Sequence, residues 1–234
     1  NKNSDIILPA CKSMEEYEEK TESDYSVLRT IKNDEVYFCM AGSGFITGSA
    51  LKLLEQIKTN KVTVIFINGD ETEFSKEQKL RNKVTKRILQ EMVRSGMISA
   101  IYLFNNKDVA EVADYNVLNY FDVINKVVVD SFLSIQYIYE SDAIRENLSQ
   151  PIEACRIIVI GVGQIDNDVK TYHNVDMPRY IHQLYELTEQ TLMKKETLGM
   201  IISSANKDER NSYKIIKGDV DRKLEVYYTN IVQE

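Results

Sequence analysis

Short apolar runs alternate along the first half of the chain with segments in which apolar residues recur every three or four positions. Residues 36–40, 62–67 and 100–104 form apolar runs that predict strands, and the β-branched run 62–67 predicts a strand buried on both faces. Helical spacing follows the first two runs, over about residues 50–57 and 75–94. This alternation predicts a parallel sheet with right-handed crossovers, in which a ligand would lie at the carboxyl ends of the strands.

The same spacing predicts two further helices. Residues 14–31 are charged and carry a partial apolar stripe, which is typical of a surface helix. A longer stripe predicts a central helix over about residues 115–138. In the helix after the second strand, Ser75 and Gln78 form a capping box, and Gly96 is a suitable C-terminal stop.

The second half of the chain follows a break in the helical pattern at Ser149, Gln150 and Pro151. Beyond the break, helical spacing covers residues 180–194, and strands are predicted at 155–163, 200–202, 213–216 and 224–228. The sequence therefore predicts an α/β protein with a parallel-sheet domain over residues 1–138, which includes the central helix, and a smaller α+β domain over residues 150–234.

Composition limits the class of protein. The 234 residues are 43% hydrophobic, which suffices for a folded core, and the net charge is −7. A negative chain is a poor match for direct electrostatic binding to nucleic acid or to an anionic membrane. No apolar run approaches the roughly 18 residues that span a bilayer, and no signal-peptide core is visible at the start. We therefore expect a soluble, cytoplasmic protein.

Metal and disulfide chemistry have little support in the sequence. Cys11, Cys39 and Cys155 are odd in number and widely spaced, which favours neutral or core positions. The residues that could form a metal cluster lie in an Asn/Asp-rich segment that is better interpreted as a turn: Asp166, Asp168, His173 and Asp176. We expect no metal site on the protein itself.

A glycine-rich turn follows the first strand, in the segment Ala41-Gly42-Ser43-Gly44-Phe45-Ile46-Thr47-Gly48-Ser49. Such a turn before a helix can hold a phosphate, because glycines let the backbone approach closely and the helix N-terminus attracts anions. A Walker loop is excluded because no lysine follows Gly48, and the dinucleotide pattern is excluded because Thr47 stands where a third glycine is needed. A tight turn without any ligand is the alternative.

The strand, the turn and the following helix resemble the signature loop of the tubulin/FtsZ superfamily, in which a Gly-Gly-Gly-Thr-Gly-Ser type turn wraps the nucleotide phosphates. Phe45 and Ile46 depart from that pattern as an insert. The resemblance implies GTP or GDP as ligand, with Mg²⁺, and these contacts to the phosphates: Gly42, Ser43, Gly44, Thr47 and Gly48.

The order of the next elements resembles the same superfamily. There, an asparagine after the third of these strands contacts guanine, and the central helix presents an aromatic ring to the base and an Asn or Asp one turn later. Asn105, Phe121 and Asn125 have these positions here. An aromatic ring can stack on a purine, and an amide can both donate and accept at the guanine edge. The alternative is a core phenylalanine and a solvated asparagine, while Glu71 and Glu73 could instead reach a ribose.

Two departures from the superfamily concern the rest of the site. Family members begin with a further strand and glycine-rich loop, whereas only about 35 residues precede Val36 and the chain starts with Asn1. Either the true N-terminus lies upstream, or half of the nucleotide cradle is missing. The family also carries acids after the central helix that activate water across a subunit interface. Glu140, Asp142 and Glu146 are the acids in that place, and the first two are our candidates.

The resemblance implies a guanine-nucleotide-binding protein that assembles head-to-tail into filaments and hydrolyses GTP between subunits. A degenerate relative that keeps the fold as a structural or interaction protein, without GTPase activity, is the main alternative. An unrelated doubly wound domain that binds another nucleotide or small ligand is a third interpretation.

Overall fold

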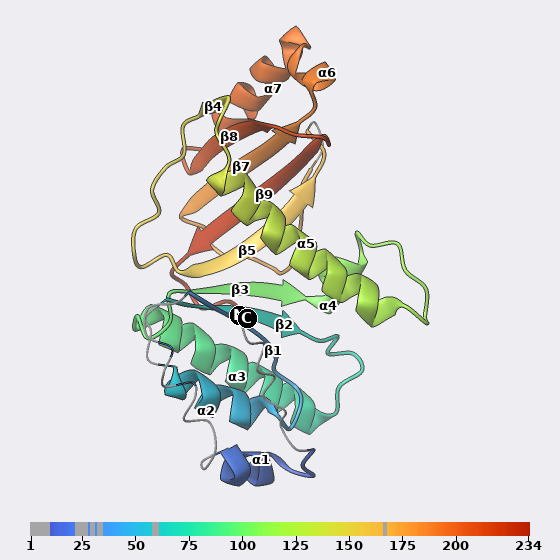
Figure 1. Ribbon diagram of the computed structural model, residues 1–234, viewed down its shortest axis with the longest axis vertical. Helices are drawn as coiled ribbons and strands as arrows, with labels where there is room; N and C mark the ends of the chain where they lie inside the picture. The colour runs from blue at the N-terminus through green and yellow to red at the C-terminus, as the bar shows by residue number, and fades with distance from the viewer. Residues whose placement is uncertain (1–9, 22–27, 29–30, 32–34, 58–60, 166–167) are drawn as a thin grey trace.

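The structure is a computed structural model that describes residues 10–21, 28, 31, 35–57, 61–165 and 168–234. It is elongated, and one sheet runs through it with helices on both faces (Figure 1). The predicted α/β class is confirmed.

The first half of the sheet is parallel. Its strands pair side by side in chain order and are β1 (Val36–Ala41), β2 (Val62–Asn68) and β3 (Ala100–Asn105). Ala41 stands opposite Ile67, and Asn68 stands opposite Asn105. All three strands therefore end at the same edge of the sheet, which is where the predicted ligand residues follow.

Helices α2 (Thr47–Gln56) and α3 (Lys76–Arg94) cover one face of this half, and α5 (Tyr120–Glu140) crosses the other (Figure 1). The expected capping box is present, because the Ser75 hydroxyl accepts from the Gln78 backbone N–H and the Gln78 side chain accepts from the Ser75 N–H. Alternate strand residues enter two cores, one with Phe66 against α3 and one with Phe104 against α5. Burial on both faces explains the uninterrupted apolar runs of β2 and β3, whereas the edge strand β1 is only partly buried.

The central helix starts later than the sequence pattern predicts. A short helix, α4 (Asn106–Ala110), follows β3, and α5 begins at Tyr120 rather than near residue 115. The intervening loop turns on Asn116, whose side-chain oxygen accepts from the backbone N–H groups of Leu118 at 3.0 Å and Asn119 at 3.2 Å. An Asn side chain that bonds nearby backbone in this way competes with the helix.

The second half of the sheet is mixed. Its strands are β4 (Arg145–Glu146), β5 (Ile157–Gly163), β6 (Lys170–Thr171), β7 (Tyr180–Leu187), β8 (Asn211–Lys217) and β9 (Arg222–Thr229). The whole sheet has the order β1-β2-β3-β5-β9-β7-β8-β4, and β6 pairs with β5. Since β3 pairs with β5, the two predicted domains share one sheet, and the boundary near residue 150 stays a prediction.

Two expectations for this half are wrong. Residues 180–187 form the central strand β7, followed by α6 (Glu189–Leu192), and residues 200–202 lie in helix α7 (Lys195–Ala205). In β7, Leu184 faces the α5 core, while Tyr185 and Leu187 face the core under α7. Both faces of β7 are buried, so apolar residues occur on each face. Their helical spacing in the sequence is therefore coincidental.

The other predicted helices and strands agree with the structure or lie partly outside the described residues. Helix α1 (Met14–Thr21) forms the start of the predicted 14–31 helix, most of whose remainder falls outside the described residues. Strands β8 and β9 match the predictions at 213–216 and 224–228. Among the helices of the described residues, none has the length and apolar character needed to cross a membrane.

Candidate functional site

The glycine loop lies between β1 and α2 and is held by its own threonine. Thr47 is fully buried, and its hydroxyl lies 2.6 Å from the Gly44 carbonyl oxygen and 3.2 Å from that of Gly42. A hydroxyl has one proton to donate, and here it is used within the loop. Helix α2 starts without a side-chain cap, and its first turn has no acidic residue. Its own first turn therefore places no carboxylate at the N-terminus of α2.

Gly42 and Gly44 have different surroundings. A Cβ added at Gly42 would lie 2.5 Å from Asn82 Oδ1 and 2.7 Å from the Phe66 ring, so this glycine is required by packing. A Cβ at Gly44 would meet nothing closer than Ile46, at 3.7 Å. Gly44 is also exposed. Of the two positions, Gly44 is the one at which a ligand could approach the backbone. Gly48 is buried in the first turn of α2.

A guanidinium that the sequence analysis did not single out lies against the loop. Arg81 of α3 donates from Nε to the Ser43 carbonyl oxygen at 3.2 Å, and its guanidinium carbon lies 4.6 Å from the centre of the Phe45 ring. A further bond joins Arg81 to Glu77 at 2.8 Å. Arg81 therefore places a positive charge at the glycine loop. One arginine on a highly charged helix gives no signal in the sequence beyond that of a solvated face.

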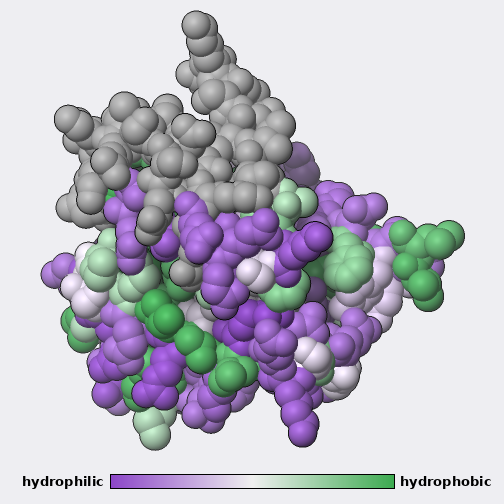
Figure 2. All heavy atoms as spheres, turned by 90° about the horizontal axis from the view of Figure 1, so that it is seen from below, coloured by the Kyte–Doolittle hydropathy of each residue, from purple (hydrophilic) through white to green (hydrophobic). Residues whose placement is uncertain are grey.

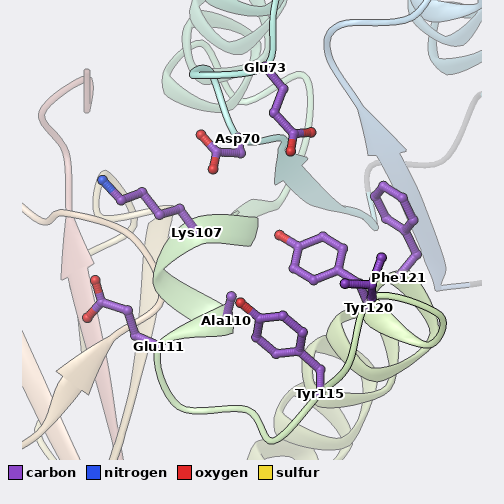
Figure 3. Close-up of a pocket in the computed structure, with 9 residues that line it drawn as sticks. Asp70, Glu73, Lys107, Ala110, Glu111, Tyr115, Tyr120 and Phe121 are labelled. Atoms are coloured by element: carbon purple, nitrogen blue, oxygen red, sulfur yellow. The ribbon is translucent and has the colours of Figure 1, made fainter.

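A cavity of about 540 Å³ opens beside the carboxyl ends of β2 and β3. Figure 3 shows Tyr115 and Tyr120 directing their hydroxyls into it, while Asp70 and Glu73 face them from the opposite wall. Phe121 lines it beyond Tyr120 and is 65% exposed. The volume lies within the roughly 300–1,000 Å³ of small-molecule sites, and three aromatic rings on one wall suit a planar ligand.

The cavity is acidic at neutral pH. Hydrogen bonds from Thr72, at 2.7 Å from its hydroxyl and 2.9 Å from its N–H, lower the pKa of Asp70 below its usual value. Glu73 and Glu111 also line the cavity, and Lys107 is the one cation among its described lining residues. Burial raises the pKa of Tyr120, so its phenol stays neutral. The carboxylates would repel phosphates here, whereas they would accept hydrogen bonds from ring N–H groups and sugar hydroxyls.

Asn105 and Asn125 flank this cavity rather than line it. The Asn105 side chain accepts from the Lys107 N–H at 3.0 Å and so caps α4. Asn105 lines an adjoining cavity of about 390 Å³, together with Asn68 and the buried Lys86, whose pKa is lowered by burial. Asn125 is exposed on α5 one turn after Phe121. Glu71 lies in the adjoining cavity, where it accepts from Asn82 at 3.3 Å.

The two candidate catalytic acids are at the other end of α5. Glu140 ends the helix, Asp142 follows it, and both are exposed. With a rise of 1.5 Å per residue, Glu140 is about 30 Å from Phe121 along the helix. These acids therefore lie far from the aromatic cavity at the other end of the helix in the same copy.

The predicted turn around His173 is not a ligand cluster in the structure. Asp166 lies outside the described residues. His173 is buried, its Nδ1 lies 2.6 Å from the Asn174 carbonyl oxygen, and burial lowers its pKa to about 4. Among the described residues, no group of three or more His, Cys, Asp or Glu side chains is arranged to hold a metal ion.

Comparison with known proteins gives matches in structure but not in sequence. No family model and no curated protein matches the chain. FtsZ from M. jannaschii matches with a TM-score of 0.66 at 13% identity, over 95% of this chain and 71% of FtsZ. A GTPγS-bound protofilament of CetZ2 from Haloferax volcanii matches with a TM-score of 0.59 at 11% identity, over 82% of this chain and 64% of CetZ2.

A filament of TubZ-Bt gives a similar result, with a TM-score of 0.59 at 12% identity, over 92% of this chain and 64% of TubZ. At these identities the matches establish the fold and not the activity. The resemblance predicted from the glycine loop and the order of elements is thus confirmed at the level of structure: the chain has the fold of the tubulin/FtsZ superfamily.

Proposed function

We propose that this chain binds a guanine nucleotide along the carboxyl edge of β1, β2 and β3 and assembles head-to-tail, with GTP hydrolysed where two copies meet. The observation that supports this most strongly is the alignment of three features at one sheet edge. An open glycine turn with an adjacent arginine, an aromatic cavity and Asn105 follow consecutive parallel strands.

The charges along this edge favour one orientation of the nucleotide. The phosphates would lie at Gly44 and the uncapped start of α2, where Arg81 adds positive charge. The base and ribose would lie in the acidic cavity, with the base on Phe121 and the ribose hydroxyls at Asp70 or Glu73. Asn125 and Asn105 would bond the guanine edge once the base is seated against Phe121.

Hydrolysis requires the acids of a neighbouring copy. Glu140 and Asp142 are exposed at the opposite end of α5, so head-to-tail stacking would bring them to the nucleotide of the next subunit. There they would polarise the attacking water, while Mg²⁺ held by the phosphates would supply the positive charge that spreads over the transferring group. CetZ2 and TubZ-Bt, which share the fold, are described as a protofilament and a filament.

Calorimetry with GTP and ATP tests the binding part of the proposal, and light scattering with and without GTP tests assembly. We expect tighter binding of GTP than of ATP and scattering that rises above a threshold protein concentration only with GTP. Equal affinities for the two nucleotides would contradict the guanine site.

The degenerate, non-hydrolysing alternative is favoured by one observation. The Thr47 hydroxyl is already bonded inside the loop, and Phe45 is held by Arg81, so the insert is part of the folded turn. Filaments that form equally well without nucleotide, and with no measurable turnover, would favour this alternative.

A further inference from the structure

One wall of the aromatic cavity, which opens beside the carboxyl ends of β2 and β3, is a cluster of three rings. The centre of the Tyr120 ring lies 5.0 Å from that of Tyr115 and 5.1 Å from that of Phe121, and both pairs are T-shaped. An edge-to-face contact uses the face of only one of its two rings. The cluster therefore keeps further ring faces for a ligand, and such faces attract positive charge.

Two carboxylates lie across the cavity from these rings. Figure 3 shows Asp70 and Glu73 on the wall opposite Tyr120. Their charge reaches the phenol, because after burial and Tyr115 they are the groups that raise the pKa of Tyr120. The two hydrogen bonds from Thr72, both to Asp70 Oδ1, lower the pKa of Asp70 and keep it ionised. A ligand between the two walls would thus lie between ring faces and fixed negative charge.

The cation in the described lining lies to one side. Lys107 is exposed, and in Figure 3 its ammonium extends away from the rings. It is the smallest of the causes that shift the pKa of Asp70. Glu111 extends to the same side as Lys107, so these two opposite charges lie together there. The charge that faces the rings is therefore negative.

The rim of the cavity adds aliphatic surface. Val117 lines the cavity and is 93% exposed, and Ala110 lines it nearer to β3. Hydrophobic atoms project at the right edge of Figure 2, which is the side of the loop between α4 and α5 in Figure 1. Alkyl groups on a positively charged ligand could contact this rim while the charge faces the rings.

We propose that the aromatic cavity binds a small quaternary ammonium compound, in which a positively charged nitrogen carries only alkyl groups. Such a cation donates no hydrogen bond, so it can use the charge of Asp70, whose Oδ1 already accepts two. A primary ammonium is more strongly hydrated and would lose more on leaving water. The inference goes beyond the proposed nucleotide. Because the base is proposed to lie in the same cavity, the two ligands should exclude each other.

Calorimetry with choline on the full chain, without nucleotide, tests the site. Choline should bind at least about tenfold more tightly than the neutral alcohol in which a carbon replaces its nitrogen, since only the charge differs. Ethanolamine, with a primary ammonium, should bind more weakly than choline. Phosphocholine should also bind more weakly, because Asp70 and Glu73 would repel its phosphate. Equal affinities for choline and the neutral alcohol, or tighter binding of phosphocholine, would overturn the proposal.

Two variants place the binding in this cavity. Tyr120→Leu removes the central ring, and Glu73→Lys reverses a charge; each should weaken choline binding at least about tenfold. Their matched controls are Tyr137→Leu, at a 50% exposed tyrosine near the other end of α5, and Asp130→Lys, in the middle of that helix. Both controls should bind choline as the wild type does.

Urea unfolding of each variant controls for folding, and Glu73 is exposed, so Glu73→Lys tests the site even if Tyr120→Leu is unstable. Undiminished choline binding in Glu73→Lys would overturn the proposed site.

Competition with GTP separates this inference from the proposed function. Choline should raise the apparent dissociation constant of GTP. Binding of GTP without any binding of choline would overturn the cation site and leave the proposed function standing. Choline binding that is lost in the Glu73 variant but has no effect on GTP would support the cation site and overturn the placement of the base in this cavity.

Discussion

The two ends of α5 have opposite characters. Its N-terminal end lines the aromatic cavity. This end lies toward the carboxyl edge of the parallel strands, the edge from which the glycine loop also extends. Its C-terminal end is fixed to the second half of the sheet, because the Tyr139 hydroxyl bonds His182 at 2.7 Å and Tyr228 at 2.8 Å, while Glu140 and Asp142 lie exposed just beyond. In the proposed function, one end would bind the nucleotide and the other would supply the acids, and about 30 Å of helix separates them. We infer that neither end is complete within one copy.

The largest effect is expected at the catalytic end. Replacing Glu140 and Asp142 by Ala should lower GTP turnover by about 100-fold or more, because water activation acts on the transition state, while binding and filament formation stay nearly unchanged. Asp130→Ala, at an exposed acid in mid-helix that pairs with Lys126, is the matched control. Phosphate release by purified filaments measures the effect, and unchanged turnover would remove both acids from the mechanism.

At the N-terminal end of α5 and the nearby glycine loop, substitutions at two glycines should have different effects. Gly44→Val should lower GTP affinity by about 10- to 100-fold without loss of stability, because its Cβ makes only an ordinary contact with Ile46 but would block a phosphate. Gly42→Val should instead lower the free energy of unfolding by about 1–3 kcal/mol through overpacking against Phe66 and Asn82.

Calorimetry and urea unfolding separate these two outcomes. A folded Gly44→Val protein that binds GTP as the wild type does would make the loop purely structural.

A smaller effect is expected in base selectivity. Asn125→Ala should reduce the preference for GTP over ATP by about 1–3 kcal/mol, the usual loss for a buried hydrogen bond. Phe121→Ala should weaken both nucleotides alike, because stacking does not distinguish the purines. Competition binding with the two nucleotides checks this. A full preference for GTP in the Asn125 variant would assign guanine recognition to other residues.

The smallest effect tests how α5 is anchored. Burial lowers the pKa of His182 to about 4, so below pH 6.5 the unfolded chain takes up a proton that the folded chain does not. This histidine alone should therefore lower the free energy of unfolding by about 1–2 kcal/mol as the pH drops from 7 to 5. The His182→Phe protein should lack this part of the pH dependence. The similar part that comes from His173, whose pKa burial also lowers to about 4, should remain. Urea titrations at several pH values would show it, and an identical pH dependence in wild type and variant would contradict it.

The parallel half of the fold could be predicted because its strands form apolar runs, which in β2 and β3 reflect burial on both faces. Strand β7 is also buried on both faces but carries His182, Gln183 and Glu186. Most of the partners of those polar groups are distant in the sequence, such as the Tyr139 hydroxyl for His182 and Ser204 and Glu225 for Gln183. No local pattern contains that information, so the segment was expected to be a helix.

In the candidate site too, some residues could be found from local sequence and others depend on distant contacts. Gly44 and Phe121 could be found from spacing, because a turn and a helix stripe are local features. Arg81 could not, since its importance comes from a contact with Ser43, 38 residues away in the sequence. Tyr115 and Tyr120 line the aromatic cavity only because the fold brings them beside Asp70 and Lys107, which follow β2 and β3.

The most direct test of the account combines the two defective ends. Gly44→Val protein, whose GTP affinity is expected to be lowered, is mixed with equal amounts of protein carrying Glu140→Ala and Asp142→Ala, which binds GTP but lacks the acids. The GTP concentration is set to saturate only the second protein. Each should be nearly inactive alone. In mixed filaments the first variant would supply its acids to the nucleotide of the second, and random mixing would restore about a quarter of wild-type turnover, since one junction in about four joins an intact acid pair to an intact loop. Co-assembly of the two proteins without any recovered turnover would contradict the claim that the two ends of α5 form one active site between copies.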